Sequence, residues 1–493
     1  MKLGIDFGTS FSLPAVTVLD TSVVLLPGGK YGIPSVFYYD EWEGVLVGEA
    51  AENAGQGEEA ANLKREIKLE LNSTFTADGR VFTARQIVGF ILNHVKENAL
   101  SAARAKLINE ELEGVVISVP AAFGHNEKEF IREAAETPVE EGGPGLKVLG
   151  FIKEPVAAAL AYFKTSLADK TRILVYDLGG GTCDAAIVEA DSSLKEKYTV
   201  IDSDMRRVGG KDWDACLETY ILESLEQQSG ISLKENPGYR EKIKRAAVSA
   251  KHAFSEKVGE KYRDRVRARV EINGKSYQVP ITSEEFGKMT FSLLWDTIEM
   301  IMALLKKNDA NSVSQIICVG GSSNMPQVIE GIKKIFPQME LRVFEPEKSI
   351  AIGASIYAGY CNGKDTFLSD MAAFSYGSDC CRNYDVDPND KIVINLIQRG
   401  DRLPVTRQHR FITTRDGQTR MRFDIYESDK EVQQYDFVPG KQPVMQIVLE
   451  LPPGLPKGTA AVLYLTLTTD GIIEAVADDG NGHSIKVQKR LNY

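Results

Sequence analysis

The sequence lacks any long apolar run. Its 493 residues contain no stretch of about 18 consecutive apolar residues, the length that begins to span a bilayer. The segment from Met1 to Asp20 carries Asp6 and turn-forming glycines, where a secretory signal requires an uninterrupted apolar core. We therefore expect a cytoplasmic protein that has no membrane partner.

Paired cysteines and a positive net charge are also absent. The six cysteines form no CxxC pair and no two of the five histidines stand four residues apart, which argues against a zinc site or a disulfide framework. With 58 Lys and Arg against 69 Asp and Glu, the net charge is −11. Such a chain offers no overall attraction to nucleic acid, so we expect no nucleic-acid partner.

Two composition regimes are present, and the change falls between Gly363 and Asp370. In the first regime, short apolar runs that end in glycine alternate with helical stretches such as Ala84 to Arg104 and Tyr239 to Lys257. This alternation is typical of α/β folds.

The second regime, Met371 to Tyr493, is strand-like. From Thr419 to Glu427, Met421, Phe423 and Ile425 alternate with Arg420, Arg422 and Asp424, which is the period of a half-buried strand. The tail therefore predicts a β-sandwich of about 120 residues.

Turn signals divide this tail further. The pairs Asp416-Gly417 and Asp470-Gly471 predict hairpin turns. The runs Ala461 to Leu467 and Ile472 to Ala477 predict a strand pair that closes the chain.

A weak internal repeat links the two halves of the first regime. The segment from Ile5 to Ser10 (IDFGTS) recurs as Tyr176 to Thr182 (YDLGGGT), and each copy lies between two apolar runs. Two copies of a strand, a glycine turn and a strand predict two similar lobes that face each other.

The two glycine turns predict a phosphate site. Gly8 and Gly179 to Gly181 let main-chain N–H groups converge on an anion, and the hydroxyls of Thr9, Ser10 and Thr182 add donors. Asp6 and Asp177 each end a first strand, where a carboxylate beside phosphates requires a cation such as Mg²⁺; Asp184 is a third candidate. The alternative is a pair of ordinary tight hairpins.

A third turn follows the strand that begins at Gln315. Gly320 and Gly321 permit close contact with a flat ring or a ribose, and a helix from Met325 to Phe336 favours anions at its start. The alternative is ordinary strand-to-helix packing. Neither a Walker loop nor a dinucleotide fingerprint occurs.

With these motifs in order, the sequence resembles the 70-kilodalton heat-shock chaperones (DnaK type) of the actin-like ATPase superfamily. The resemblance covers essentially the whole chain, and it implies that the chain is a lidless, divergent member of this family. The matching segments are Gly4 to Ser10, Val116 to Phe123, Ile152 to Tyr162, Val175 to Asp184, Val208 to Asp214 and Val319 to Ser322.

The resemblance implies a two-lobed ribonuclease H-like ATPase domain at 1–364, a linker at 365–370 and a substrate-binding β-sandwich at 371–493. Asp6, Glu154 and Asp177 would hold Mg²⁺, while Asp177 and Thr182 would align the attacking water. The catalytic lysine is either Lys64 or Lys68. The other residues implied to bind ATP or ADP are Gly8, Thr9, Ser10, Phe11, Gly179, Gly180, Gly181, Asp184, Gly209, Gly210, Lys251, His252, Ser255, Gly320, Gly321, Ser322, Asn324 and Glu347.

The adenosine pocket departs from the family pattern. His252 and Asn324 stand where two arginines sandwich the adenine, and Val248 stands at a ribose-binding glutamate. Stacking on a guanidinium contributes roughly 0.5 to 2 kcal/mol. Losing both arginines therefore predicts a nucleotide affinity that is about 10-fold to 100-fold lower.

Two further implied sites concern signalling and substrate. Pro120 matches a proposed conformational switch, and Lys128 stands where the family has an arginine that senses it. The implied peptide groove is lined by Ser378, Cys381, Phe411, Met421 and Phe423. For Phe423, a position in the core is an equal alternative. Ser369 interrupts the usually apolar linker. The chain stops where the family's helical lid begins, so bound peptide is expected to leave quickly.

The resulting hypothesis is a slow ATPase whose nucleotide state controls the binding of unfolded polypeptide, with a co-chaperone and a nucleotide-exchange factor as further partners. One alternative is a nucleotide-sensing scaffold that hydrolyses little ATP and binds a dedicated partner. The less favoured alternative is an actin-like small-molecule kinase, which requires an acceptor site and a general base.

Overall fold

The computed structural model describes residues 1–26, 31–55, 57–121, 123, 125–138, 143–165, 170–191, 198–258, 261–308, 312–361, 368–369, 372, 374–430, 432–468 and 471–490. The chain forms two compact units. One comprises Met1–Phe123, Glu127–Ser193 and Ser203–Asp365, and the other comprises Gly124–Asn126, Leu194–Asp202 and Thr366–Tyr493. Among the helices in the described ranges, none is both long and apolar enough to cross a membrane.

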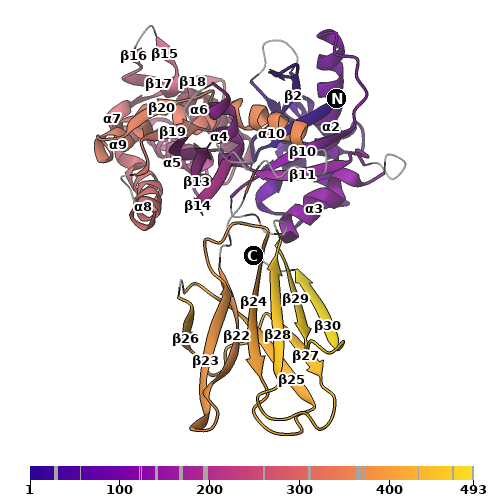
Figure 1. The fold of residues 1–493 in the computed structure, drawn as a ribbon. Helices are drawn as coiled ribbons and strands as arrows, with labels where there is room; N and C mark the ends of the chain where they lie inside the picture. Colours follow the sequence, from indigo (N-terminus) through magenta and orange to yellow (C-terminus); the bar gives the residue numbers. More distant parts are fainter. Residues whose placement is uncertain are drawn as a thin grey trace. The chain divides into compact units, whose positions relative to one another are not determined.

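The first unit begins with a mixed sheet, here called lobe I together with the elements that cover it (Figure 1). Its strand order is β11-β10-β1-β2-β3, and β4 pairs with β2. Parallel pairing of β1 with β10 and antiparallel pairing with β2 place β1 in the centre. The strands are β1 (Lys2–Phe7), β2 (Phe11–Val18), β3 (Thr21–Val24), β4 (Ile33–Pro34), β10 (Gly114–Val119) and β11 (Val148–Lys153).

Helix α2 (Ala84–Ala105) covers this sheet because its apolar residues repeat at helical spacing. Ile87, Ile91 and Val95 are fully buried in the lobe I core. Thr83 and Gln86 form a capping box that fixes where the helix begins. The other elements of lobe I are β5 (Phe37–Asp40), β6 (Gly44–Val47), α1 (Glu49–Ala54), η1 (Gly57–Asn62), β7 (Leu63–Lys64), η2 (Ile67–Leu69), β8 (Thr74–Ala77), β9 (Arg80–Thr83) and α3 (His125–Glu136).

A second mixed sheet, with the elements that cover it, is called lobe II. Its order is β20-β19-β12-β13-β14-β21. Its hairpin β12/β13 repeats the hairpin β1/β2, as the internal repeat predicts. The strands are β12 (Lys170–Leu178), β13 (Cys183–Asp191), β14 (Tyr198–Arg206), β19 (Gln315–Val319), β20 (Glu340–Val343) and β21 (Leu368–Ser369).

The remaining lobe II elements include long helices and two short hairpins. Asn273 and Gly274 have positive φ and form the turn of the β17/β18 hairpin. The elements are α5 (Gly210–Ser229), α6 (Pro237–Ser255), β15 (Lys257–Val258), β16 (Lys261–Tyr262), β17 (Arg265–Ile272), β18 (Lys275–Thr282), α7 (Ser283–Met289), α8 (Phe291–Lys307), η5 (Gly321–Asn324) and α9 (Pro326–Ile335).

Helices α4 (Glu154–Thr165) and α10 (Ser349–Tyr360) pack closely against each other. A Cβ at Gly353 would lie 1.8 Å from the carbonyl oxygen of Ala157, and a Cβ at Gly4 of β1 would lie 2.1 Å from the amide nitrogen of Ser355. The small residues of these segments therefore allow backbones to touch, which no larger side chain permits.

The second unit contains a β-sandwich (Figure 1). Its two sheets have the orders β26-β23-β22-β25-β27 and β24-β28-β29-β30, and side chains from both sheets form one core. The strands are β22 (Ser375–Asn383), β23 (Asp387–Ile397), β24 (Val405–Ile412), β25 (Arg420–Ser428), β26 (Gln434–Asp436), β27 (Met445–Glu450), β28 (Ala460–Leu467), β29 (Ile472–Asp478) and β30 (Ser484–Arg490).

Two predictions about the strands of the sandwich are wrong in detail. Asp416-Gly417 makes a turn, but β24 and β25 belong to different sheets, so the turn is no hairpin. The pair β28/β29 forms as predicted, but β30 follows it and pairs with β29. Asp470 lies outside the described residues.

The predicted face of β25 is confirmed, since Met421, Phe423 and Ile425 are buried. Asp424, expected on the exposed side, is also buried; it accepts hydrogen bonds from Arg422 and Gln446. Most of the expected linker at 365–370 lies outside the described residues, and within it Leu368 and Ser369 pair in parallel with β14. The predicted domain limits stay a prediction.

Replacing Phe423 by Ala tests whether this ring stabilises the sandwich. Its side chain is 2% exposed and lies edge-on to Phe411 at 5.2 Å between ring centroids. We expect the free energy of unfolding to fall by about 3 to 5 kcal/mol, seen in calorimetry of the full chain as a lower midpoint for the β-sandwich. Ile412→Ala, at a residue 56% exposed, should change the free energy of unfolding by less than about 0.5 kcal/mol. An unchanged midpoint for Phe423→Ala would contradict the core role.

Candidate functional site

The two repeated hairpins place the predicted aspartates at equivalent positions. Asp6 lies near the end of β1, and Asp177 lies near the end of β12, where it is paired in register with Asp184 of β13. All three carboxylates are buried. Ser118 of β10 donates a hydrogen bond to Oδ1 of Asp6 at 3.0 Å.

Glu154 and Lys68 complete a buried charge cluster. Glu154 is the first residue of α4, and Lys68 lies in the short helix η2. Nζ of Lys68 is 2.5 Å from Oε1 of Glu154 and also donates to the carbonyl oxygen of Phe7. Nζ of Lys64 instead pairs with Glu70 at 2.5 Å. Of the two candidate lysines, only Lys68 thus lies with the buried carboxylates.

Burial dominates the electrostatics of these carboxylates. Burial first, and then proximity to Glu154, raise the pKa of Asp6 and of Asp184 to about 7. The pKa of Asp177 is raised well above its usual value by burial and by Glu154, Asp184 and Asp6. Lys68 offsets part of each shift. The cluster therefore carries more negative potential than one lysine neutralises.

A cleft of about 580 Å³ opens beside this cluster, a volume typical of small-ligand sites. The predicted residues that line it are Asp6, Gly8, Thr9, Ser10, Phe11, Lys68, Glu154, Asp177, Gly179, Gly180, Thr182, Lys251, His252, Ser255, Gly320, Gly321, Ser322, Asn324 and Glu347. Four of the predicted nucleotide-binding residues, Gly181, Asp184, Gly209 and Gly210, and the candidate catalytic lysine Lys64 are not in the lining.

Glycine is required where the loops around the cleft converge. A Cβ at Gly180 would lie 2.3 Å from Oγ of Ser10, and a Cβ at Gly209 would lie 2.6 Å from the backbone of Gly181. The amide of Gly210 donates to the carbonyl of Gly179 at 2.9 Å. The glycine turn of lobe II therefore packs directly on the start of α5, which explains why Gly181 and Gly209 do not reach the cleft.

The other end of the cleft is formed by α6 and the turn after β19. Nζ of Lys251 is 2.6 Å from Asp214 and donates to the carbonyl of Gly210 at 2.9 Å. Burial lowers the pKa of His252, so its ring is neutral near pH 7. Among the described residues no arginine lines the cleft.

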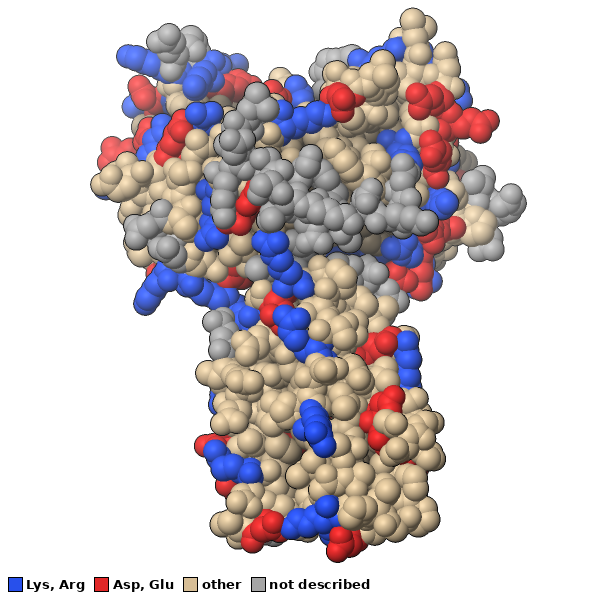
Figure 2. Space-filling model, in the orientation of Figure 1, with Lys and Arg blue, Asp and Glu red and all other residues tan. Residues whose placement is uncertain are grey.

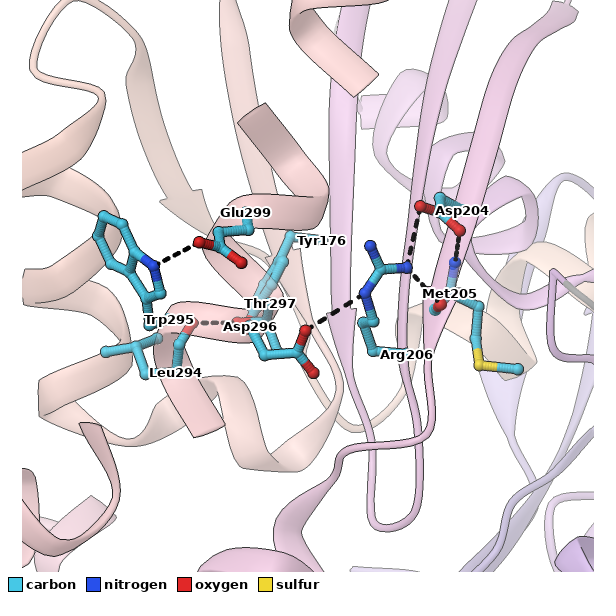
Figure 3. Close-up of polar contacts among 9 residues, drawn as sticks. All are labelled: Tyr176, Asp204, Met205, Arg206, Leu294, Trp295, Asp296, Thr297 and Glu299. Atoms are coloured by element: carbon cyan, nitrogen blue, oxygen red, sulfur yellow. Dashed lines mark hydrogen bonds and ion pairs between the residues drawn. The ribbon is translucent and has the colours of Figure 1, made fainter. Parts of the chain in front are cut away.

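The strand that carries Asp177 is fixed to helix α8. The hydroxyl groups of Tyr176 and Thr297 are 3.0 Å apart, both buried (Figure 3). Nearby, Arg206 of β14 pairs with Asp296 of α8 at 3.4 Å. These contacts hold the lobe II hairpin in a defined position.

The predicted switch residues lie at the turn after β10. Pro120 is buried, and the amide of the next residue, Ala121, donates to Oδ1 of Asp184 at 2.7 Å. Oδ2 of Asp184 is buried without a hydrogen-bond partner in the described part of the chain. Lys128 lies half-buried in α3. The switch role of Pro120 and Lys128 stays a prediction.

The predicted groove residues lie in the β-sandwich. Phe411, Met421 and Phe423 belong to its core cluster. Ser378 is fully buried, and its Oγ has no hydrogen-bond partner among the described residues. Cys381 is half-buried on β22. Their peptide-binding role stays a prediction.

Several site features were missed from the sequence. Ser118 holds Asp6, and Glu49, Glu52 and Glu256 line the cleft. Arg65 also pairs with Glu52 within lobe I at 2.7 Å, and it joins the lobes through an ion pair with Glu241 of α6 at 3.7 Å. No local motif marks these residues, because each acts through partners far away in the chain.

Comparison with known proteins gives similarity over the whole chain. A model of the family described as "Hsp70 protein" matches residues 56–490. A chaperone protein HscA of Salmonella arizonae is 30% identical over 100% of this chain and 78% of its own length. Chaperone proteins DnaK of Anaplasma marginale and Thermotoga petrophila are 28% and 27% identical, over 99% and 97% of this chain and 76% and 78% of their own lengths.

Asp184→Asn tests the buried cluster through its pH dependence. Because the folded-state pKa of Asp184 is raised to about 7, the stability linked to its proton is complete near pH 4 and is lost as the pH rises through about 7. Asn has no proton to lose and still accepts from Ala121. Without metal or nucleotide, the variant should be more stable than wild type above about pH 7, and the difference should shrink as the pH falls and vanish only near about pH 4. Thermal unfolding midpoints measure this, and a difference independent of pH would contradict it.

Proposed function

Because the chain belongs to the Hsp70 family, we propose that it is an ATP-dependent chaperone whose first unit binds and hydrolyses ATP. Nucleotide state would control the binding of extended apolar polypeptide by the β-sandwich. The observation that carries this proposal is the pair of repeated hairpins that bring Asp6 and Asp177 together with Glu154 and Lys68 beside one cleft.

The buried carboxylates fit a divalent cation. Asp6, Glu154, Asp177 and Asp184 lie together, Oδ2 of Asp184 has no hydrogen-bond partner among described residues, and Lys68 is the one described cation buried among them. No group of three or more His, Cys, Asp or Glu side chains in the described ranges is arranged to hold a metal ion directly. Mg²⁺ keeps several waters, so Asp6, Glu154 and Asp177 would hold it largely through them. Bound Mg²⁺ would neutralise phosphate charge.

The residues of the cleft would each act on the triphosphate. The hairpin glycines, Thr9 and Ser10 would donate hydrogen bonds to phosphate oxygens. Lys68 would place its ammonium beside the terminal phosphate, where it would stabilise negative charge in the transition state. Thr182 and Asp177 would orient the attacking water, which the position of Thr182 in the cleft lining supports.

The base end would bind adenosine weakly. Lys251 is already held by Asp214 and Gly210, and His252 and Asn324 offer no guanidinium on which a purine can stack. This departure supports a second candidate, a nucleotide-sensing scaffold with little hydrolysis that binds a dedicated partner.

The β-sandwich would bind the polypeptide. The relatives named above are chaperone proteins, which supports this role. A co-chaperone and a nucleotide-exchange factor would be further partners. Coupling between the sites is reciprocal for binding, so peptide would also change nucleotide affinity.

Single-turnover ATP hydrolysis by the full chain tests the enzymatic proposal. Lys68→Ala should slow hydrolysis at least about 100-fold, because it removes the only buried cation that the structure describes in the carboxylate cluster. Lys64→Ala is the matched control and should stay within about twofold of wild type, since its ion pair with Glu70 is outside the cleft. Equal effects of the two substitutions would contradict the assignment.

Adding an unfolded apolar peptide to the same assay separates the two candidates. A chaperone predicts that peptide changes the rate of hydrolysis. A vanishing wild-type rate that peptide does not change would favour the scaffold.

A further inference from the structure

Strand β17 carries a row of three exposed arginines. Arg265, Arg267 and Arg269 alternate with Val266, Ala268 and Val270, and the apolar residues face the interior. Successive members of the row are about 6.7 Å apart, because a strand rises about 3.3 to 3.4 Å per residue and side chains alternate. We call Arg265, Arg267 and Arg269 the arginine row.

The neighbours of the arginine row carry negative charge only at its two ends. Across the hairpin the residues paired with the row are Thr282, Pro280 and Gln278, all uncharged. Arg267 and Arg269 make no hydrogen bond or ion pair with any described residue. Glu285 interacts electrostatically with Arg265 at one end, and the exposed Glu271 follows Arg269 on the same face at the other end.

Nearby Lys and Arg side chains add to the positive potential of the arginine row. Lys257, Lys261 and Arg263 lie on or beside the adjoining hairpin β15/β16, and among the described residues the ion pair in this group is that of Arg263 with Glu256 at 3.8 Å. Lys and Arg side chains gather over the part of the surface where Figure 1 places β15 to β17 (Figure 2). Like charges at this spacing repel, so the free row is suited to a ligand that supplies matching negative charge.

We propose that the arginine row binds an extended acidic polypeptide segment that has a carboxylate at every second residue. Such a segment repeats at the same distance of about 6.7 Å, so each carboxylate meets one guanidinium, the geometry that favours two parallel hydrogen bonds. This surface lies outside the cleft, and its binding does not depend on the proposed ATPase activity.

Two observations favour polypeptide over nucleic acid. Within the described hairpin β17/β18, the face of the row presents no aromatic ring on which bases stack, since the residues opposite are Thr282, Pro280 and Gln278. The chain as a whole carries a charge of −11, which repels a long polyanion more than a short acidic segment that senses mainly the local field.

Fluorescence anisotropy with the full chain tests the proposal. The probe is a labelled octapeptide of alternating Glu and Thr, and two control peptides replace Glu by Gln or place the four Glu residues together. The test variant is Arg265→Gln/Arg267→Gln/Arg269→Gln. The control variant is Lys306→Gln/Lys333→Gln/Lys334→Gln, which removes the same charge from exposed positions of α8 and α9.

We expect the test variant to weaken binding of the alternating peptide about tenfold and the control variant less than about twofold. The alternating peptide should bind more tightly than either control peptide, and its affinity should fall as salt is added. Unchanged thermal unfolding of the test variant would verify that it is folded, as expected for exposed side chains.

Three outcomes would overturn the proposal. They are the absence of saturable binding, equal loss of binding in both variants, and tighter binding of a single-stranded oligonucleotide that the test variant abolishes. The last outcome would identify the row as a nucleic-acid surface instead.

Discussion

The function proposed for the first unit depends on four carboxylates that are held together away from water. Asp6, Glu154, Asp177 and Asp184 are buried within reach of one another, and Lys68 is the one described cation buried among them. Burial alone raises the pKa of such groups, and mutual repulsion raises it further. This arrangement favours cation binding in the cleft, because buried carboxylates attract a cation far more strongly than carboxylates in water do.

The fold delivers these groups from distant parts of the sequence. The hairpins β1/β2 and β12/β13 supply the aspartates, while α4 supplies Glu154 at its first residue. Close packing of α4 and α10 is possible because Gly353 and Ala157 bring their backbones into contact. Tyr176 and Thr297 hold the strand of Asp177 against α8. Substitutions far from the cleft would therefore change its geometry.

The sequence allowed the hairpins β1/β2 and β12/β13 and their glycine turns to be predicted, because a glycine turn between two apolar runs is local information. The choice between Lys64 and Lys68 required the structure. Glu66, between them, has a left-handed backbone with φ of 59°, so the two side chains leave the segment in different directions. Strand β30 was missed because Ile485 and Val487 are the only apolar residues in its polar sequence. Asp416-Gly417 predicted a turn correctly but not the change of sheet after it.

The most direct test is a crystal structure of the full chain with ADP and Mn²⁺, in which anomalous scattering locates the metal. The account predicts a manganese peak between the hairpins, within reach of Asp6, Glu154 and Asp177 directly or through one water, with the phosphates on Gly8 to Ser10 and Gly179 to Thr182. Nucleotide bound elsewhere, or a cleft that holds phosphates without any metal beside these carboxylates, would contradict it.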